Sequence, residues 1–203
     1  MRIHAPLALA LALPAFAGGE IGLLLDKQMG KAQTVAAGQQ IRSGNYDSVS
    51  PSGMGFRVGA SFLDIGIMAL GVNATYHPKA EEDLKINGAK IGKFGAEYVA
   101  VGAGLDWKLL INLHAGVEIR REKFTGDLYP PTGTGVLSGS ASTTRPWMKF
   151  GLGFSIPLPV VSPFVRLELA VPTTKNDKTG TPDDLRQALA PQYQIALYGG
   201  LRF

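Results

Sequence analysis

Apolar and polar residues alternate with a period of two along eight segments of the chain, which is the pattern of β-strands with two different faces. In chain order the predicted strands are Glu20–Met29, Ser52–Leu63, Gly66–His77, Phe94–Leu105, Leu109–Arg121, Thr144–Ile156, Pro163–Val171 and Gln192–Phe203. The fifth strand is the clearest, because Leu113, Val117 and Ile119 share one face while His114 and Glu118 share the other. The phase of the fourth strand is ambiguous. The pattern predicts an all-β chain.

The connections between these strands alternate in length. Those after the second, fourth and sixth strands are short, around Asp64, Asp106 and residues 157–163. The other connections are long and rich in Gly, Ser, Thr, Asp and Lys. The last of them contains a predicted short exposed helix, since Thr181 is a good N-cap and Pro191 ends the pattern. Short turns on one side and long loops on the other predict an antiparallel up-and-down meander.

Alternation alone does not tell which face is inside, because a soluble barrel buries its apolar face and a membrane barrel exposes it. Two features favour the membrane barrel. The polar faces mix charges with glycine, as in Gly55, Arg57 and Gly59, and a charged side chain in the narrow interior of eight strands needs small neighbours. The apolar faces are nearly free of charge over lengths that match a tilted bilayer crossing of about 9–11 residues.

We therefore predict a closed eight-stranded antiparallel up-and-down transmembrane β-barrel over residues 18–203, with short periplasmic turns and long extracellular loops. Closure is needed because hydrocarbon does not tolerate an unpaired strand edge, so the last strand must pair with the first. Residues 1–17 have the pattern of a secretory signal peptide, with Arg2 before an apolar run and a small-residue site at Ala15 and Ala17. The alternative for this segment is a buried N-terminal helix.

Composition narrows the function classes. The chain of 203 residues has no cysteine, which excludes disulfides and thiolate metal sites. Its net charge is +4, and the basic residues are scattered, so no nucleic-acid partner is expected. No segment after the first 17 residues is long and apolar enough to predict a transmembrane helix.

The eight amphipathic strands, the alternation of short turns and long loops, and the terminal aromatic in phase with the last strand together resemble the small outer-membrane β-barrel superfamily. The OmpA transmembrane domain and OmpX are the nearest shapes, and OmpW-like barrels are more distant ones. The resemblance implies location in the cell outer membrane and recognition of the last strand by the barrel assembly machinery. The residues expected to form this assembly signal are Tyr193, Ile195, Leu197, Leu201 and Phe203.

Charged side chains on the polar faces predict a network inside the lumen. Its expected members are Asp26, Arg57, His114, Glu118, Arg120, Arg145, Lys149, Arg166, Glu168 and Arg202, with Glu97 if the fourth strand has that phase. We interpret the network as a structural plug, because an eight-stranded lumen has little free volume and buried charges must be paired. The alternative is a selectivity or gating network of a small pore. Positive charge is expected to exceed negative charge.

Candidate catalytic groups are sparse. His114 is the one histidine on a clear lumen phase, with Glu118 further along the same face, but a hydrolase also needs a nucleophile beside such a base. Lipid A deacylases on eight-stranded barrels carry a His-x-Ser arrangement that faces the membrane, whereas this chain has "HAG". His77 is expected in a loop. We therefore predict no catalytic residues, no cofactor and no metal.

The lipid-facing surface offers two further expectations. Lys27 and Arg121 lie at the long-loop ends of their strands, where a cation reaches the headgroup layer, so lipopolysaccharide phosphates are candidate partners beside other outer-membrane lipid. A plain solvated charge explains them equally well. Aromatic residues are expected in two girdles. The upper girdle would hold Phe56, Tyr76 and Tyr193, and the lower one Phe62, Trp107, Phe164 and Phe203.

Three functions are compatible with these features of the sequence. The leading hypothesis is a monomeric, non-enzymatic outer-membrane protein with a plugged polar lumen and a role in envelope structure or surface contact. The second is a narrow porin-like or OmpW-like channel or conduit for small solutes. The third, and weakest, is a lipid A-modifying enzyme.

Overall fold

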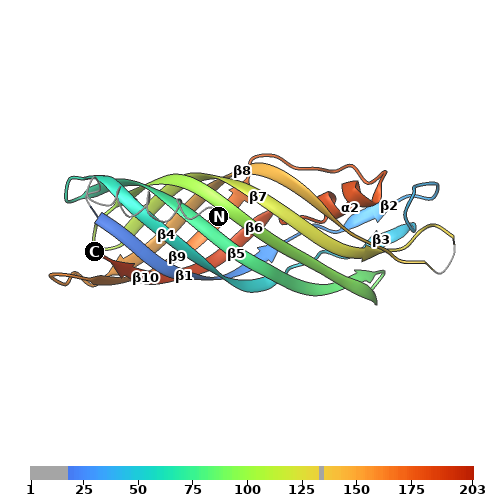
Figure 1. Ribbon diagram of the computed structural model, residues 1–203, viewed down its shortest axis with the longest axis horizontal. Coiled ribbons are helices and arrows are strands. Elements are labelled where there is room, and N and C mark those ends of the chain that lie inside the picture. Colours follow the sequence, from blue (N-terminus) through green and yellow to red (C-terminus); the bar gives the residue numbers. More distant parts are fainter. Residues whose placement is uncertain (1–17, 133–134) are drawn as a thin grey trace, which may run out of the picture.

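The computed structural model describes residues 18–132 and 135–203, so the predicted signal peptide lies outside the described residues. Eight long strands wind into an elongated barrel (Figure 1). They are β1 (Gly18–Met29), β4 (Ser52–Asp64), β5 (Met68–Ile86), β6 (Ala89–Trp107), β7 (Asn112–Leu128), β8 (Leu137–Ser155), β9 (Ser162–Pro172) and β10 (Tyr193–Arg202). Each strand pairs antiparallel with its neighbours, as the sequence predicts for a meander.

The ring closes between the first and last barrel strands. β1 pairs antiparallel with β10 from Glu20 opposite Arg202 to Met29 opposite Tyr193. The Phe203 amide donates to the Gly19 carbonyl at 3.0 Å, so the last residue continues this pairing. The closure predicted from the need to remove strand edges is confirmed.

The apolar faces of the strands point out of the barrel. Val117, Phe154 and Leu167 are each more than half exposed, while Arg57 and Lys149 are buried inside. The exposed apolar side chains form a continuous outer belt, far larger than the apolar patches of soluble monomers. This orientation is the one expected of a barrel whose surrounding solvent is lipid.

Four barrel strands are longer than the sequence pattern indicated. β5, β6 and β8 have 19 residues each and β7 has 17, so they extend well past the membrane crossing on the long-loop side. The expected long loop between β5 and β6 is instead a two-residue turn of Asn87 and Gly88, both with positive φ (50° and 81°). An Asn-Gly pair favours this kind of hairpin turn, so the sequence did contain the signal.

Smaller elements cover the extracellular end, on the right of Figure 1. The strands β2 (Gln33–Val35) and β3 (Gly44–Tyr46) form a hairpin that joins the sheet through β5. The helix α2 (Pro182–Ala188) has Thr181 as its N-cap in a capping box with Asp184, which confirms the predicted helix. The helix is less exposed than expected, because Leu185 and Ala188 are buried.

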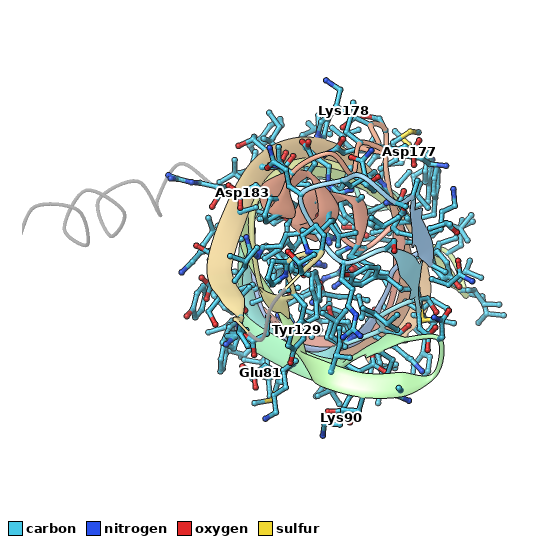
Figure 2. The ribbon with its side chains drawn as sticks, turned by 90° about the vertical axis from the view of Figure 1, so that its right-hand side faces the viewer. Glu81, Lys90, Tyr129, Asp177, Lys178 and Asp183 are labelled. Carbon is cyan, nitrogen blue, oxygen red and sulfur yellow. The ribbon has the colours of Figure 1, made fainter. Side chains whose placement is uncertain are left out.

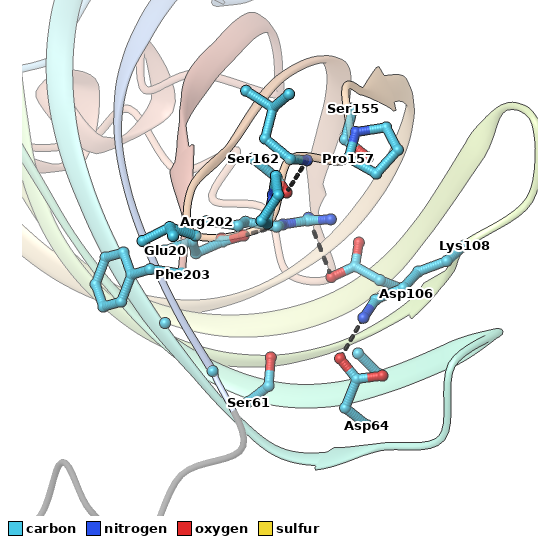
Figure 3. A pocket seen from close by; sticks show the side chains of 16 residues that line it. Glu20, Ser61, Asp64, Asp106, Lys108, Ser155, Pro157, Ser162, Arg202 and Phe203 are labelled. Carbon is cyan, nitrogen blue, oxygen red and sulfur yellow. Dashed lines mark hydrogen bonds and ion pairs between the residues drawn. The ribbon is translucent and has the colours of Figure 1, made fainter.

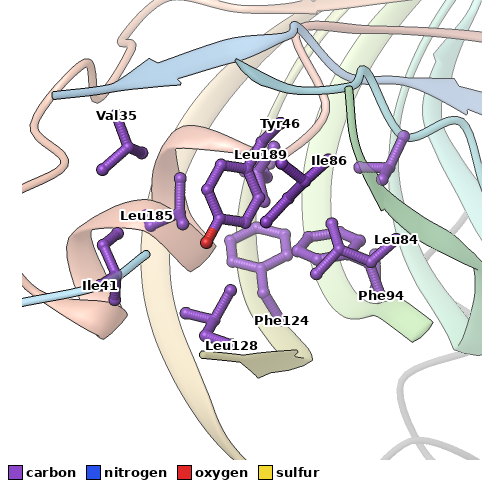
Figure 4. Close-up of a cluster of buried hydrophobic side chains, with 13 residues drawn as sticks. Val35, Ile41, Tyr46, Leu84, Ile86, Phe94, Phe124, Leu128, Leu185 and Leu189 are labelled. Atoms are coloured by element: carbon purple, nitrogen blue, oxygen red, sulfur yellow. The ribbon is translucent and has the colours of Figure 1, made fainter. Parts of the chain in front are cut away.

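These buried helix residues belong to an apolar core inside the extracellular half of the barrel, which we call the apolar cap (Figure 4). Its members are Val35, Ile41, Tyr46, Val49, Leu84, Ile86, Phe94, Ala96, Phe124, Leu128, Leu185, Leu189 and Ala190. The rings of Phe94 and Phe124 stack with centroids 6.0 Å apart. Burial raises the pKa of the Tyr46 phenol, against the opposing charge of Arg42. The cap closes the barrel above the membrane.

Candidate functional site: the charged lumen

The centre of the lumen is bridged by a buried ion pair. Arg57 on β4 donates from Nη1 to both carboxylate oxygens of Glu168 on β9, at 2.7 and 2.8 Å. Arg166 donates to the same carboxylate at 2.7 Å, and Thr75 accepts from Arg57 Nε at 3.0 Å. All four residues are buried. Because an unpaired charge in such a place is very costly, these contacts explain how the charges are tolerated.

A second buried group joins strands β5, β7, β8 and β10. Glu118 accepts from Arg120 and forms an ion pair with Lys149 Nζ at 2.8 Å. Lys149 also donates to Asn73 Oδ1 at 3.2 Å, and Arg120 Nη2 donates to Gln194 Oε1 at 2.5 Å. The side chains of Glu118, Arg120 and Lys149 are at most 1% exposed. The group therefore ties different walls of the lumen together through buried charges.

A third group surrounds Asp26 and includes a residue that the sequence reading misplaced. His77, expected in a loop, is fully buried in the lumen, where its Nε2 lies 2.9 Å from Asp26 Oδ1 and its ring stacks on Tyr98 at 5.1 Å. Gln194 donates to Asp26 and to the Tyr98 hydroxyl. Room for the imidazole comes from Gly53, where a Cβ would lie 2.7 Å from the ring. The sequence did contain a signal for this position. Neighbouring residues of a strand point to opposite faces, so His77 must point inward if Tyr76 points outward.

The upper end of the lumen is closed by a bidentate pair. Arg145 donates to both oxygens of Glu122 at 2.6 and 2.8 Å and to the Pro191 carbonyl at 2.9 Å. The Trp147 ring lies between two guanidinium groups, with those of Arg120 and Arg145 at 3.9 and 5.1 Å from its centroid. The sequence reading ended the fifth strand before Glu122 and so omitted this carboxylate.

The periplasmic end of the lumen opens into a cavity of about 360 Å³, which we call the vestibule (Figure 3). Asp106 stands at its inner end and contacts Arg166 Nη1 at 2.8 Å and His114 Nδ1 at 3.0 Å. Arg202 at the mouth pairs with Glu20 at 3.2 Å and reaches Asp106 at 3.7 Å. The vestibule therefore reaches Asp106, while His114 and the groups above it are buried.

The structure brings all ten sequence-predicted lumen residues into the barrel interior, Arg202 at its mouth. The expected excess of positive charge is wrong, because three carboxylates were missed: Glu20, Asp106 and Glu122. Among the described residues, six cations face six carboxylates between the Arg202 mouth and the Arg145 pair, above the Lys108–Asp64 pair of the turns. They are Arg57, Arg120, Arg145, Lys149, Arg166 and Arg202 against Glu20, Asp26, Asp106, Glu118, Glu122 and Glu168. The lumen is thus electrically balanced.

Two outer-surface expectations also need correction. Glu97 does not face the lumen: it pairs on the outside with Lys123 at 3.1 Å, and Tyr98 takes the inward position. Phe164 is no girdle residue, because it is buried against Tyr198 with ring centroids 5.0 Å apart and lies under Arg202.

Other surface residues lie where they were expected. Lys27 and Arg121 are exposed at the long-loop ends of the belt. The five residues of the expected assembly signal are all exposed on the outer face at β10 and just beyond it. Their recognition by lipopolysaccharide or by the assembly machinery stays a prediction.

The lumen has little of what catalysis requires. His114 is held by Asp106, but its Nε2 has no hydrogen-bond partner among the described residues. The hydroxyl of Ser155 accepts instead from Asn112 at 3.0 Å. Within residues 18–132 and 135–203, no group of three or more His, Asp or Glu side chains is arranged to hold a metal ion. None of the helices in the same residues is long and apolar enough to cross a membrane.

Comparison with known proteins supports the architecture. No family model and no curated protein match the chain. Its fold is similar to that of Ail, the attachment invasion locus protein of Yersinia pestis, in a crystal structure with the heparin analogue sucrose octasulfate. The two chains are 14% identical, the match covers 92% of this chain and 98% of Ail, and the TM-score is 0.51. A second crystal structure of Ail gives 15% identity over the same shares, with a TM-score of 0.50.

A major outer membrane protein from Thermus thermophilus is also similar, at 15% identity over 90% of this chain and 98% of that chain, with a TM-score of 0.49. At these identities, the likeness to Ail shows the fold. The apolar belt, the closed ring and the charged lumen define an integral β-barrel of the outer-membrane type. The predicted fold class and the resemblance to small outer-membrane barrels are confirmed, and the cell outer membrane is the location that this class implies.

Proposed function

We propose that the protein is a non-enzymatic, monomeric outer-membrane barrel that conducts no solutes and acts through the structure it presents outside the cell. One observation carries this proposal: the lumen contains two successive closures. The paired charges fill it at membrane depth, and the apolar cap fills it above. Either closure alone would oppose a continuous water path, so a channel is the less favoured function.

The extracellular half supports a surface role. Strands β5 to β8 carry it well above the membrane, and its outer face is polar, with Glu81, Lys90, Asp177 and Lys178 spread around the rim seen end-on in Figure 2. A rigid apolar core beneath a charged rim is suited to holding a contact surface in a fixed shape, because packed cores deform little. Envelope structure and contact with other molecules are both compatible with this arrangement.

Single-channel recording tests the closed lumen. Purified protein, shown to be folded by heat-modifiable mobility, should produce no reproducible conductance steps in a planar bilayer in which a porin control conducts. Lys149→Glu is the matched variant, because it would change the charge of any water path past Glu118. Steady conductance of the unmodified protein that Lys149→Glu alters would contradict the proposal and favour the channel.

We also propose that the outward residues of β10, together with Phe203 just beyond it, form the assembly signal for the barrel assembly machinery. Tyr193 and Phe203 are both exposed on the outer face, so replacing them with serine removes no buried contact. The double variant should accumulate in the periplasm, while the control Phe154→Ser on β8 should insert. Equal insertion of both variants would contradict this role.

A further inference from the structure

The three short periplasmic turns are unusually apolar. They connect β4 to β5, β6 to β7 and β8 to β9, and they expose large aliphatic side chains where a water-facing turn would carry polar ones. Leu110 is 97% exposed and Val160 is 79% exposed. We call the exposed set the turn ring: Ile65, Ile67, Leu109, Leu110, Ile111, Leu158 and Val160.

Polar side chains of the same turns point the other way. Lys108 pairs with Asp64 across two neighbouring turns, and both line the vestibule (Figure 3). Ser162 also lines it and accepts from the Leu158 amide at 3.3 Å. The first two turns therefore separate a polar inner side from an apolar outer side, whereas Leu158 and Val160 of the third turn are exposed and also line the vestibule. The outer belt continues through the turns without a change of polarity.

The backbone of the first turn is suited to a medium without water. The Ile65 amide donates to the Met68 carbonyl at 2.9 Å, and the Gly66 amide to Asp64 Oδ1 at 3.0 Å. The Ile67 amide donates to the Ile65 carbonyl at 3.0 Å, and the Lys108 amide to the Ile67 carbonyl at 2.8 Å, which links this turn to the next. Backbone groups in hydrocarbon must be satisfied internally, and these four amides are.

The third turn lowers the number of its backbone donors by composition. Pro157, Pro159 and Pro163 have no amide hydrogen to satisfy. The Ile156 amide donates to the Pro163 carbonyl at 3.0 Å. A turn exposed to water does not need fewer backbone donors, because water accepts hydrogen bonds from its amides.

The position of the turns along the barrel axis fits immersion. On β7 the outward residues are apolar from Leu113 to Ile119 and become charged at Arg121, which marks the outer headgroup level. From Arg121 down to Asn112, where β7 begins just after Leu110, the strand descends roughly 23 Å at about 3.3 Å per residue and a tilt of about 40°. An outer-membrane barrel has an apolar band about 25 Å tall, so Leu110 falls at its lower boundary.

We propose that the turn ring lies in the acyl-chain boundary of the inner leaflet, so that the periplasmic end of the barrel does not project into the periplasm. The occupant of this surface is lipid because the apolar residues surround the rim, with three turns and Phe203 distributed around the eight strands. A docked protein would be expected to cover apolar residues on one side of the rim only. The vestibule then opens directly at the lipid–water boundary. This proposal is independent of whether the lumen conducts.

Site-directed spin labelling tests the immersion, and the absence of cysteine makes single-site labelling direct. Leu110→Cys and Val160→Cys would carry nitroxides in vesicles of phosphatidylethanolamine and phosphatidylglycerol. Val117→Cys in the middle of the belt and Lys90→Cys on β6, beside the extracellular turn of Asn87 and Gly88, are the controls. We expect collision with a water-soluble nickel complex to be severalfold lower at both turn sites than at residue 90. Collision with oxygen should be high, as at residue 117.

Nickel accessibility at residues 110 and 160 equal to that at residue 90 would overturn the proposal, because the turns would then lie in water. Protection of one turn alone would also overturn it, in favour of a one-sided protein contact or a second copy of the chain. All four substituted side chains are exposed, so failure to fold is not expected to obscure the result.

Discussion

The two halves of the barrel are built from the same strands with opposite polarity. On β7 the inward residues change from Glu118, Arg120 and Glu122 in the membrane half to Phe124 in the extracellular half, with no break in register against β8. The outward residues of the same strand change from apolar, as at Ile119, to charged. Each half therefore places its apolar face according to the medium around it: lipid outside one half and water outside the other.

This contrast teaches that a β-strand's alternation specifies two faces but not which face is the core. In the membrane half the barrel holds buried charges in its lumen, and it does so by pairing them across strands. In the extracellular half ordinary apolar burial stabilises the chain, as in a soluble protein. The stability of one half should depend on ion pairs, and that of the other on packing.

The largest effect is expected in the lumen of the membrane half. Glu118→Ala leaves Arg120 and Lys149 without their shared carboxylate, so the free energy of unfolding should fall by about 3–5 kcal/mol. Urea unfolding in lipid vesicles, followed by tryptophan fluorescence, measures it. The double variant Glu118→Ala with Lys149→Met should recover part of the loss. A loss below about 1 kcal/mol, as for a solvent-screened pair, would show that water enters the lumen.

The apolar cap should respond to loss of packing instead. Phe124→Ala removes a fully buried ring that stacks on Phe94, and a buried Phe→Ala change costs about 3–5 kcal/mol. The loss should be local: proteolysis of the extracellular segments should accelerate while the membrane half keeps its heat-modifiable mobility. Lys123→Ala, on the outer face of the same strand, is the control and should change stability by less than about 0.5 kcal/mol. Simultaneous loss of both halves would show that they unfold as one unit.

The outer surface gives a matched test of the two media. Val117→Arg places a charge in the middle of the apolar belt and should cost about 2–4 kcal/mol. Ser142→Arg places the same charge on the exposed outer face of β8 in the extracellular half and should be nearly neutral. Both are measured by urea unfolding in vesicles. Equal costs would mean that the membrane boundary does not lie between these two positions.

The membrane half could be predicted from sequence because its alternation is clear in every strand except β6, whose phase is ambiguous. Every strand there has an apolar face free of charge, and the need for closure fixed the pairing of β1 with β10. The extracellular half could not, because its outward residues are charged and its hairpins read as polar loops. The segment from Arg121 to Lys123 is entirely charged in sequence, although Glu122 points inward and its neighbours point outward. If the alternation of inward and outward residues in the membrane half is continued past Arg121, it places Glu122 inside the barrel.

The difficulty of following strands into the extracellular half also explains why some lumen residues were wrongly placed. His77 and Glu122 sit where the two halves meet, and both were assigned to loops because apolar residues beyond them were not read as a strand face. Asp106 was assigned to a short turn, yet it pairs with Arg166 from the end of β6. Which carboxylate contacts which cation depends on register across the whole ring, and a single strand's pattern does not contain that information.

The smallest effect is expected for an ion pair on the outer face of the extracellular half. Glu81 is exposed, and a hydrogen bond from Lys79 lowers its pKa, with Lys93 adding to the effect. Because the folded-state pKa is below the ordinary value, any stabilisation is present above that ordinary value and is lost as the pH falls through the lowered one. Glu81→Gln should therefore lower the urea midpoint only slightly at neutral pH and not at all in strong acid.

Salt gives the control for this last comparison. The small effect of Glu81→Gln at neutral pH should disappear in about 1 M salt, which screens exposed charges, whereas the loss from Glu118→Ala should persist because its partners are shielded from solvent. Urea midpoints of both variants at low and high salt measure the difference. If both effects vanished together in salt, the lumen charges would be as hydrated as the surface ones, and the contrast between the two halves would rest on packing alone.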